Sequence, residues 1–230
     1  MDRAAEAYGR IRHFAELVGG EPDETPLDLA VATIGSVLRP MFDMARTLET
    51  LDDLAERVQE RTFDGVRTAL FERAGFRGND HDYDHPDNSM LDLVLQRGTG
   101  LPILLAVVAI EVGRRVAVPI VGIGMPMHFL VRDADDEEAF LDPFTGDALD
   151  PDGARRRLDE VSGGAMTWSD RFLRVVPARH IVIRVLTNLQ SSFKVRHDPV
   201  RLALVARLRA EVPELHSERG AAIRRSAIFN

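Results

Sequence analysis

Residues Gly98 to Arg132 read GTGLPILLAVVAIEVGRRVAVPIVGIGMPMHFLVR, and an acidic turn then leads to AFLDPF at residues 139–144. The part from Leu101 to Val116 is apolar on nearly every side, which is typical of a helix buried on several faces. Short β-branched and aromatic runs follow and favour strands at 120–123, 129–132 and 139–142. This stretch predicts an α+β fold, in which a central buried helix packs against a small antiparallel sheet.

The last two predicted strands are joined by the acidic turn 133–138 and should form a hairpin. A hairpin symmetric about Asp135 pairs Arg132 with Glu138, and it pairs His128 with Asp142. Cross-strand partners point to the same face of a sheet, with Cβ atoms about 5 Å apart. A two-residue error in the turn would leave His128 and Asp142 diagonal and within reach, whereas a one-residue slip would separate them.

Helical patterns, with apolar residues at steps of three and four, flank this stretch on both sides. Before it they cover 1–18, 26–38, 52–61, 63–74 and 89–96, and after it 177–194, 198–211 and 218 to the end. The segment from Asp150 to Trp168 shows no such period, and we expect it to be irregular. The chain thus divides into an N-terminal helical segment (1–75), a core (76–170) and a C-terminal helix pair (171–230).

The composition is that of a soluble globular protein, with 230 residues of which 45% are hydrophobic and 29% are charged. The longest apolar run, Leu101 to Val112, is interrupted by Glu111 and is too short to span a bilayer. The N-terminus lacks the pattern of a secretory signal. We therefore expect a cytoplasmic protein that does not bind membranes.

The absence of cysteine excludes disulfides, cysteine-ligated zinc and a thiolate nucleophile. The net charge of −8 argues against nucleic acid as a partner. The charge is uneven, because residues 171–230 carry twelve basic against four acidic residues, while the first 170 carry 17 against 33. The basic end could dock on the acidic body or bind an acidic protein partner, and the sequence leaves both open.

Three motifs carry a resemblance to a known family: FRGNDHDYDHPDNSMLDLVLQRGTGLPILL at 76–105, MPMHFLVR at 125–132 and LDPFTG at 141–146. They resemble a bacterial branch of the transglutaminase-like superfamily, the invasion-regulator (Sir B) type, which usually carries a C-terminal tetratricopeptide segment. The similarity covers roughly residues 28–230. The last part has room for only about one helical repeat, and since a free-standing array needs about three, we expect it to pack on the body.

The resemblance implies a papain-like core with a catalytic triad. The triad consists of a cysteine at the start of the central helix and of a histidine and an aspartate on adjacent strands. The helix dipole and the imidazolium lower the thiol pKa, and the aspartate orients the ring. His128 and Asp142 match the last two positions. The place of the cysteine is occupied by residues that cannot attack a substrate, namely Leu101, Pro102 and Ile103. The family usually has glycine before the histidine, and Met127 at that position is expected to crowd the cleft.

The polar residues near the helix start are candidates for other roles. Hydroxyl nucleophiles could be supplied by Ser89 or Thr99, but these fit a first-turn helix residue and a loop or cap residue better. Binding candidates around the loop 78–88 and the helix start are Asn79, Tyr83, Asn88, Ser89 and Pro102. Of these, Tyr83 and Asn88 are expected to fix the loop by hydrogen bonds.

A metal site is the weaker interpretation of the same loop. His81 and His85 alternate there with aspartates, but Pro86 argues against the helix that would place both imidazoles on one face. A solvated loop whose carboxylates cap neighbouring backbone explains the pattern better. We expect neither a metal nor a cofactor.

The leading interpretation is a pseudoenzyme, a non-catalytic binding or regulatory module that uses the degenerate cleft and the C-terminal helices. The alternative is a hydrolase of the amidase or peptidase type, with His128 and Asp142 acting on an activated or metal-bound water. A third possibility is a scaffold whose basic end binds an acidic partner. In a chain without cysteine, the histidine–aspartate pair could also simply pin the two strands together.

Overall fold

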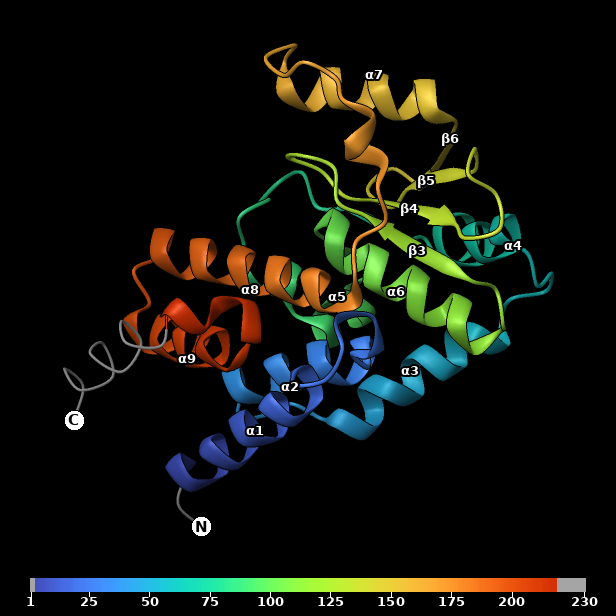
Figure 1. Ribbon diagram of the computed structural model, residues 1–230. Coiled ribbons are helices and arrows are strands. Elements are labelled where there is room, and N and C mark those ends of the chain that lie inside the picture. Colours follow the sequence, from blue (N-terminus) through green and yellow to red (C-terminus); the bar gives the residue numbers. More distant parts are fainter. Residues whose placement is uncertain (1–2, 219–230) are drawn as a thin grey trace.

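The computed structural model describes residues 3–218, with most helices on one side of a small sheet and α7 on the other (Figure 1). The α-helices are α1 (Arg3–Val18), α2 (Leu27–Leu38), α3 (Met44–Glu56), α4 (Phe63–Arg67), α5 (Leu91–Arg97), α6 (Pro102–Arg115), α7 (Pro151–Ser162), α8 (Ala178–Val195) and α9 (Pro199–Glu211). The strands are β1 (Arg77–Gly78), β2 (Thr99–Gly100), β3 (Ile120–Ile123), β4 (Leu130–Asp133), β5 (Phe140–Asp142) and β6 (Asp147–Leu149). Within residues 3–218, every helix is too short or too polar to span a lipid bilayer.

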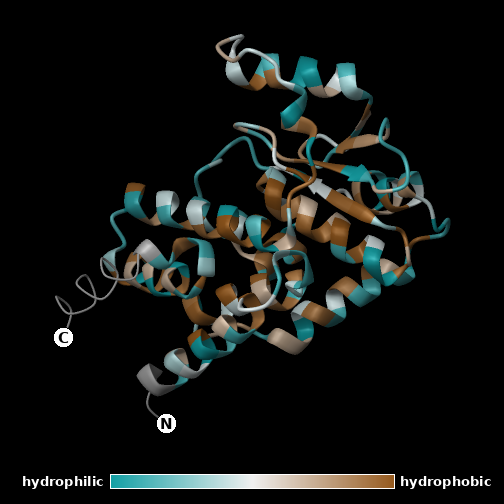
Figure 2. Ribbon diagram, in the orientation of Figure 1, coloured by the Kyte–Doolittle hydropathy of each residue, from teal (hydrophilic) through white to brown (hydrophobic). Residues whose placement is uncertain are grey.

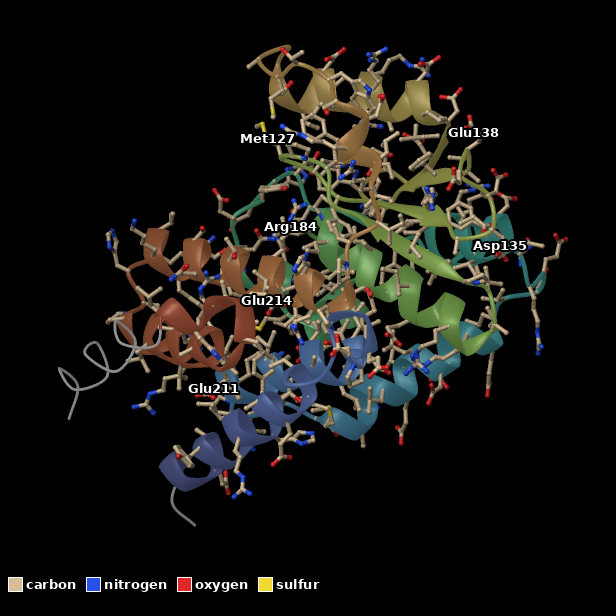
Figure 3. The ribbon with its side chains drawn as sticks, viewed as in Figure 1. Met127, Asp135, Glu138, Arg184, Glu211 and Glu214 are labelled. Carbon is tan, nitrogen blue, oxygen red and sulfur yellow. The ribbon has the colours of Figure 1, made fainter. Side chains whose placement is uncertain are left out.

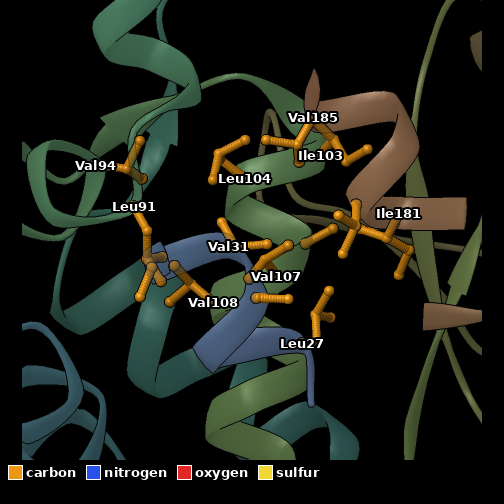
Figure 4. Packing of buried hydrophobic residues seen from close by; sticks show 14 of the residues in the cluster. Leu27, Val31, Leu91, Val94, Ile103, Leu104, Val107, Val108, Ile181 and Val185 are labelled. Atoms are coloured by element: carbon orange, nitrogen blue, oxygen red, sulfur yellow. The ribbon is translucent and has the colours of Figure 1, made fainter. Parts of the chain in front are cut away.

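Helix α6 is the centre of the main hydrophobic core, as the sequence predicts. It begins with Pro102 at a first-turn position, and eleven of its residues are buried. Figure 4 shows its side chains between residues of three other helices, α2, α5 and α8. Strands β3 and β4 also contact α6. Contact on several sides explains why the helix carries no polar face, and Figure 2 shows the same concentration of apolar residues along it.

Strands β3 to β6 form an antiparallel sheet in sequence order, and the predicted hairpin is its β4–β5 pair. The predicted pairing of Arg132 with Glu138 is wrong by two residues, because Arg132 lies opposite Phe140. Two aspartates lengthen the turn: the Asp133 carboxylate accepts from the amide of Asp135, and the Asp136 carboxylate accepts from that of Glu138, both at 2.9 Å. Such side-chain bonds to nearby amides stabilise a turn, which here centres on Asp136.

The segment after Asp150, predicted to be irregular, instead contains α7. The Asp150 carboxylate accepts a hydrogen bond from the amide of Gly153, and Gly163 ends the helix with a positive φ of 59°. Both are standard helix boundary signals. Helix α7 packs through Ala154 and Leu158 into a second, smaller core under β4 and β5. Figure 1 shows it at the far side of the sheet from α6.

Two predicted helix starts are also wrong. Helix α3 begins at Met44 rather than near residue 52, because the Asp43 carboxylate accepts from the amide of Arg46 and caps an earlier turn. Helix α5 begins at Leu91 rather than Ser89, since Asn88 and Ser89 belong to a short 3-10 turn, Pro86–Ser89, that precedes it. The two-stranded parallel pair of β1 and β2 was not predicted.

The C-terminal helices α8 and α9 have the bounds that the sequence predicts to within one residue, and they pack against each other. Residues of both belong to the same hydrophobic core as α1, α2 and α6. A short 3-10 segment, Pro213–Glu218, follows α9. The further helix expected from residue 218 onward lies outside the described residues.

Candidate functional site

His128 and Asp142 are in direct contact inside the protein. His128 lies two residues before β4, and Asp142 is the last residue of β5. The Nε2 atom of His128 is 2.9 Å from Oδ1 of Asp142, with the side chains 5% and 0% exposed. The observed strand pairing differs from the predicted one by two residues, so His128 and Asp142 are diagonal neighbours and not direct cross-strand partners. A shift of two residues keeps both side chains on the same face of the sheet and within reach. An ionised carboxylate only accepts hydrogen bonds, so Nε2 carries the proton in this arrangement.

A third side chain, Arg157, holds the other oxygen of Asp142. Its Nε lies 2.8 Å from Oδ2 at an angle unsuited to a hydrogen bond, so the contact is an ion pair. Arg157 also contacts Asp147 at 3.2 Å and Glu160 at 3.1 Å. The amide of Phe144 donates to Oδ1 of Asp142 at 2.8 Å. The buried carboxylate is therefore fixed from three directions, and a buried charge needs such partners.

Sequence reasoning missed Arg157 because it lies on α7, in the segment predicted to be irregular. The signal that could have found it is the helix start at Asp150, which places Arg157 about two turns into α7. From there its guanidinium reaches back to the end of β5.

The second ring nitrogen of His128, Nδ1, has no hydrogen bond to any residue within 3–218. The ring of Phe144 stands edge-on to the imidazole with 6.2 Å between centroids, and the ring of Tyr83 lies 6.1 Å beyond that of Phe144. Met127, next to His128, is 61% exposed and has a positive φ of 61°. Nδ1 is thus the position from which the imidazole can bond to a ligand.

The start of α6 offers no attacking atom. Leu101, Pro102 and Ile103 are all buried, and the amide of Leu101 donates to the carbonyl oxygen of Asn88 at 3.0 Å. Thr99 lies in β2, where it pairs with Arg77. The hydroxyl of Ser89 is buried, and it has no hydrogen-bond partner in the described part of the chain.

Asn88 organises the loop that precedes this helix start. Its Nδ2 donates to the carbonyl oxygens of Asp82 at 2.7 Å and Tyr83 at 3.1 Å, and its Oδ1 accepts from Nδ2 of Asn79 at 3.0 Å. Asn88 is fully buried. It fixes the loop as the sequence predicts, whereas Tyr83 contributes its main-chain oxygen to this network and its ring to Phe144. Asn79 and Asn88 therefore have mainly structural contacts.

The comparisons with known proteins show the family to which this chain belongs. The family model described as the transglutaminase-like superfamily matches residues 37–187, from the end of α2 to the middle of α8. The chain belongs to the transglutaminase-like superfamily. It is 41% identical over 134 residues to a UPF0162 protein of Xylella fastidiosa, an alignment that covers 56% of this chain and 47% of that relative.

Other relatives match a similar part of this superfamily chain. A UPF0162 protein of Pseudomonas aeruginosa is 30% identical over 171 residues, covering 70% of this chain and 62% of the relative. The mouse protein named F-box only protein 21 is 32% identical over 140 residues, covering 58% of this chain and 22% of that protein. The chain spans about half the length of the Xylella relative. No solved structure matches it.

A partly buried arginine of α8 supports the loop that presents His128. Arg184 donates from its two terminal nitrogens to the carbonyl oxygens of Met125 at 3.2 Å and His128 at 2.9 Å. Its guanidinium lies 5.1 Å from the centroid of the Phe129 ring. Burial lowers the pKa of Arg184, and the nearby Tyr83 opposes this. Figure 3 shows Arg184 on α8, below the loop that carries Met127.

The two histidines of the loop are not brought together with other ligands. His81 is 98% exposed, and Nδ1 of His85 accepts a hydrogen bond from the amide of Asp87 at 3.2 Å. Within the described residues, no group of three or more histidine and carboxylate side chains is arranged to hold a metal ion. Arg196 instead pairs with Asp82 at 2.7 Å and ties this loop to the end of α8.

Proposed function

We propose that this protein is a non-catalytic transglutaminase-like module that binds a protein partner through the cleft at His128 and through helices α8 and α9. The observation that carries the proposal is the start of α6, where buried leucine, proline and isoleucine stand at the position that the resemblance assigns to the nucleophile. The chain contains no cysteine that could reach the histidine from elsewhere. Without an attacking atom, the histidine has no nucleophile to activate at this position.

The intact remainder of the site supports binding. Asp142 is held by His128, Arg157 and the Phe144 amide, so the imidazole has a fixed orientation. Its Nδ1 is left without a partner among the described residues. A rigid acceptor beside the exposed Met127 side chain and the half-exposed Tyr83 ring suits recognition of a polypeptide, since interfaces combine apolar contact with a few fixed polar groups.

The C-terminal helices support a regulatory role. Arg184 of α8 holds the carbonyl oxygen of His128, and Arg196 near the end of α8 holds the preceding loop through Asp82. A partner that binds α8 and α9 would therefore act on both walls of the cleft. This fits the invasion-regulator type with one tetratricopeptide-like helix pair, which we propose for the chain.

An activity screen tests the non-catalytic part of the proposal. Purified wild-type protein and the His128→Ala variant are assayed with amide, peptide and acyl-transfer substrates. We expect no turnover by either protein. Turnover by the wild type that is lost in His128→Ala would overturn the proposal.

Site-specific photocrosslinking tests the binding part. A benzophenone amino acid is placed at Met127, beside His128, or at Tyr8 on α1, which is 70% exposed. We expect a discrete protein adduct from position 127 in cell extract, reduced at least fivefold by His128→Ala and missing from position 8. The same adducts from both positions would count against a partner in the cleft.

The intact histidine–aspartate pair also favours a second candidate, a hydrolase in which His128 and Asp142 activate a water. In that case, Nδ1 of the imidazole would take the proton from the water. The activity screen separates the two candidates, because only the hydrolase predicts turnover that depends on His128 and Asp142.

A further inference from the structure

A cavity lies away from His128. It has a volume of about 670 Å³ and is bounded by the segment before α2, the second half of α6, strand β3 and the segment before α8. In Figure 1 these parts meet where the loop before α2 passes the start of α8. Neither His128 nor Asp142 lines the cavity, so it is distinct from the cleft proposed above.

Glu111 provides an acceptor inside this cavity. The side chain is nearly inaccessible, with 2% of the residue exposed, and it lines the cavity wall. Its Oε2 accepts hydrogen bonds from Arg114 and Arg115, both at 2.8 Å. No residue in the described part of the chain donates a hydrogen bond to Oε1. Oε1 is not completely covered by protein atoms, so a donor on a ligand in the cavity can reach it.

The charges around Glu111 are not balanced by the arginines. Asp28 accepts from Arg114 at 3.0 Å and from Arg115 at 2.8 Å. Arg115 also contacts Asp52 at 2.6 Å. Two guanidinium groups therefore face three carboxylates, those of Asp28, Asp52 and Glu111, and one negative charge is left over. Asp23 and Glu24 are exposed and add two more negative charges at the rim. Such an excess attracts cations.

The pKa of Glu111 reflects this crowding. Burial raises it most, the neighbouring charge of Asp28 raises it further, and the two arginines oppose both effects. A cation placed at Oε1 would relieve both the burial and the repulsion.

Thr25 is an independent sign of a missing ligand. The residue is 5% exposed and lines the cavity, and its hydroxyl oxygen is buried without a hydrogen-bond partner among residues 3–218. A buried hydroxyl normally has a partner. The remaining wall is largely apolar, and includes Leu27, Ile110, Ile120, Val121, Val176 and Ile181. The cavity therefore combines a negative polar end with an apolar wall.

We propose that this cavity binds a small organic cation, a protonated primary amine on a short apolar chain. The ammonium group donates to Oε1 of Glu111 and to the hydroxyl of Thr25, and the chain packs against Ile110, Ile120 and Ile181. An ammonium group has three donors and no acceptor, which suits the two acceptors without a donor, Oε1 of Glu111 and Oγ1 of Thr25, although Arg114 also lines the cavity.

Calorimetric titration of the full chain with n-hexylammonium chloride tests the proposal, with n-hexanol as a neutral control of the same length. We expect one saturable site for hexylammonium, with an affinity at least tenfold above that for hexanol. Equal affinities, or no saturable binding of hexylammonium, would overturn the proposal.

Variants locate the bound amine. Glu111→Gln keeps the shape of the side chain and removes its charge, and we expect at least tenfold weaker binding of hexylammonium. Glu49→Gln, on an exposed position of α3, is the matched control and should leave the affinity unchanged. An unchanged affinity in folded Glu111→Gln would overturn the assignment.

Two further variants keep the test decisive if Glu111→Gln does not fold. Ile110→Trp fills the cavity from a partly exposed wall position and should abolish the binding. Asp23→Asn combined with Glu24→Gln changes only the exposed rim and should weaken it two- to threefold. Binding unaffected by Ile110→Trp would contradict the proposal, and so would binding unaffected by the rim changes.

Discussion

At the scale of single residues, Asp142 is the buried charge on which the candidate site depends. It is fully buried and contacts His128, Arg157 and the amide of Phe144. Asp142→Ala leaves the buried Nε2 of His128 and the amide of Phe144 without their acceptor, and it removes one of the three carboxylates that Arg157 contacts. We expect it to lower the free energy of unfolding by about 3 kcal/mol.

Urea denaturation monitored by circular dichroism measures this loss. Glu137→Ala, at an exposed position of the same hairpin, is the control, and it should change the free energy of unfolding by less than about 0.5 kcal/mol. Equal effects of the two substitutions would show that the contacts of Asp142 contribute little.

The backbone at Met127 favours glycine at this position. Its φ of 61° lies in the left-handed region, which costs a residue with a side chain about 1–2 kcal/mol and costs glycine almost nothing. Since 61% of Met127 is exposed, Met127→Gly loses little packing. We expect this variant to be up to about 1 kcal/mol more stable in thermal unfolding, and Met127→Val to be less stable than the wild type. The opposite order would contradict the backbone explanation.

At the scale of elements, helix α7 depends on its cap. Asp150→Ala removes the acceptor for the amide of Gly153, which typically costs about 1 kcal/mol. Since the cap stabilises the first turn, we expect its loss to appear first as faster amide hydrogen exchange in Pro151–Ser162, the helix that carries Arg157. Asp152→Ala, two residues further along in the first turn of α7, is the control and should leave hydrogen exchange in α7 nearly unchanged.

The sequence predicts α8 and α9 well because apolar residues recur at steps of three and four, and it predicts α6 well because a long continuous apolar run specifies a buried helix. Prediction from the sequence fails for α7. The buried face of this helix contains little beyond Ala154 and Leu158, so the helix can be recognised from its boundary residues but not from apolar periodicity. The sequence places the β4–β5 turn two residues off, since the aspartates that lengthen the turn act through side-chain bonds. The contact between His128 and Asp142 survives this error because a two-residue shift keeps both side chains on one face.

At the scale of the whole molecule, Arg179 connects the end of α1 with the segment that follows α9. It is 5% exposed, bonds to Glu214 after α9 at 2.8 Å and donates to the carbonyl oxygen of Val18 at the end of α1 at 3.0 Å. Burial would raise the pKa of Glu214, but the hydrogen bond and charge of Arg179 outweigh it, so that the pKa is lowered. Figure 3 shows Glu214 close to the packed helices.

This pair makes a defined contribution to pH dependence. A carboxyl group with a lowered pKa in the folded state stabilises it above the ordinary glutamate pKa of about 4.3, and this contribution is lost as pH falls through the lowered value. Glu214→Gln removes the contribution. We expect it to be less stable than the wild type at pH 7 and to lose less stability between pH 5 and pH 3, as measured by urea unfolding. A parallel loss in both proteins would contradict this assignment.

The sequence alone leads to the histidine–aspartate pair and to the missing nucleophile, but not to the cavity beside Glu111. That cavity is formed by segments that are distant in the chain, from Thr25 to Ile181, and no local pattern brings them together. The central claim is that the site is complete apart from the attacking atom.

Restoring that atom tests the claim most directly. Cysteine is introduced at one position at a time, as Leu101→Cys, Pro102→Cys or Ile103→Cys. Val108→Cys, in the middle of α6, is the control. The thiol pKa of each variant is measured from the pH dependence of alkylation by iodoacetamide. The account predicts a pKa below about 7.5 for at least one of the three, against about 8.5 for a free thiol, and a return toward the free value when His128→Ala is added. Thiol pKa values at or above 8.5 in all three variants, or values that His128→Ala does not change, would contradict it.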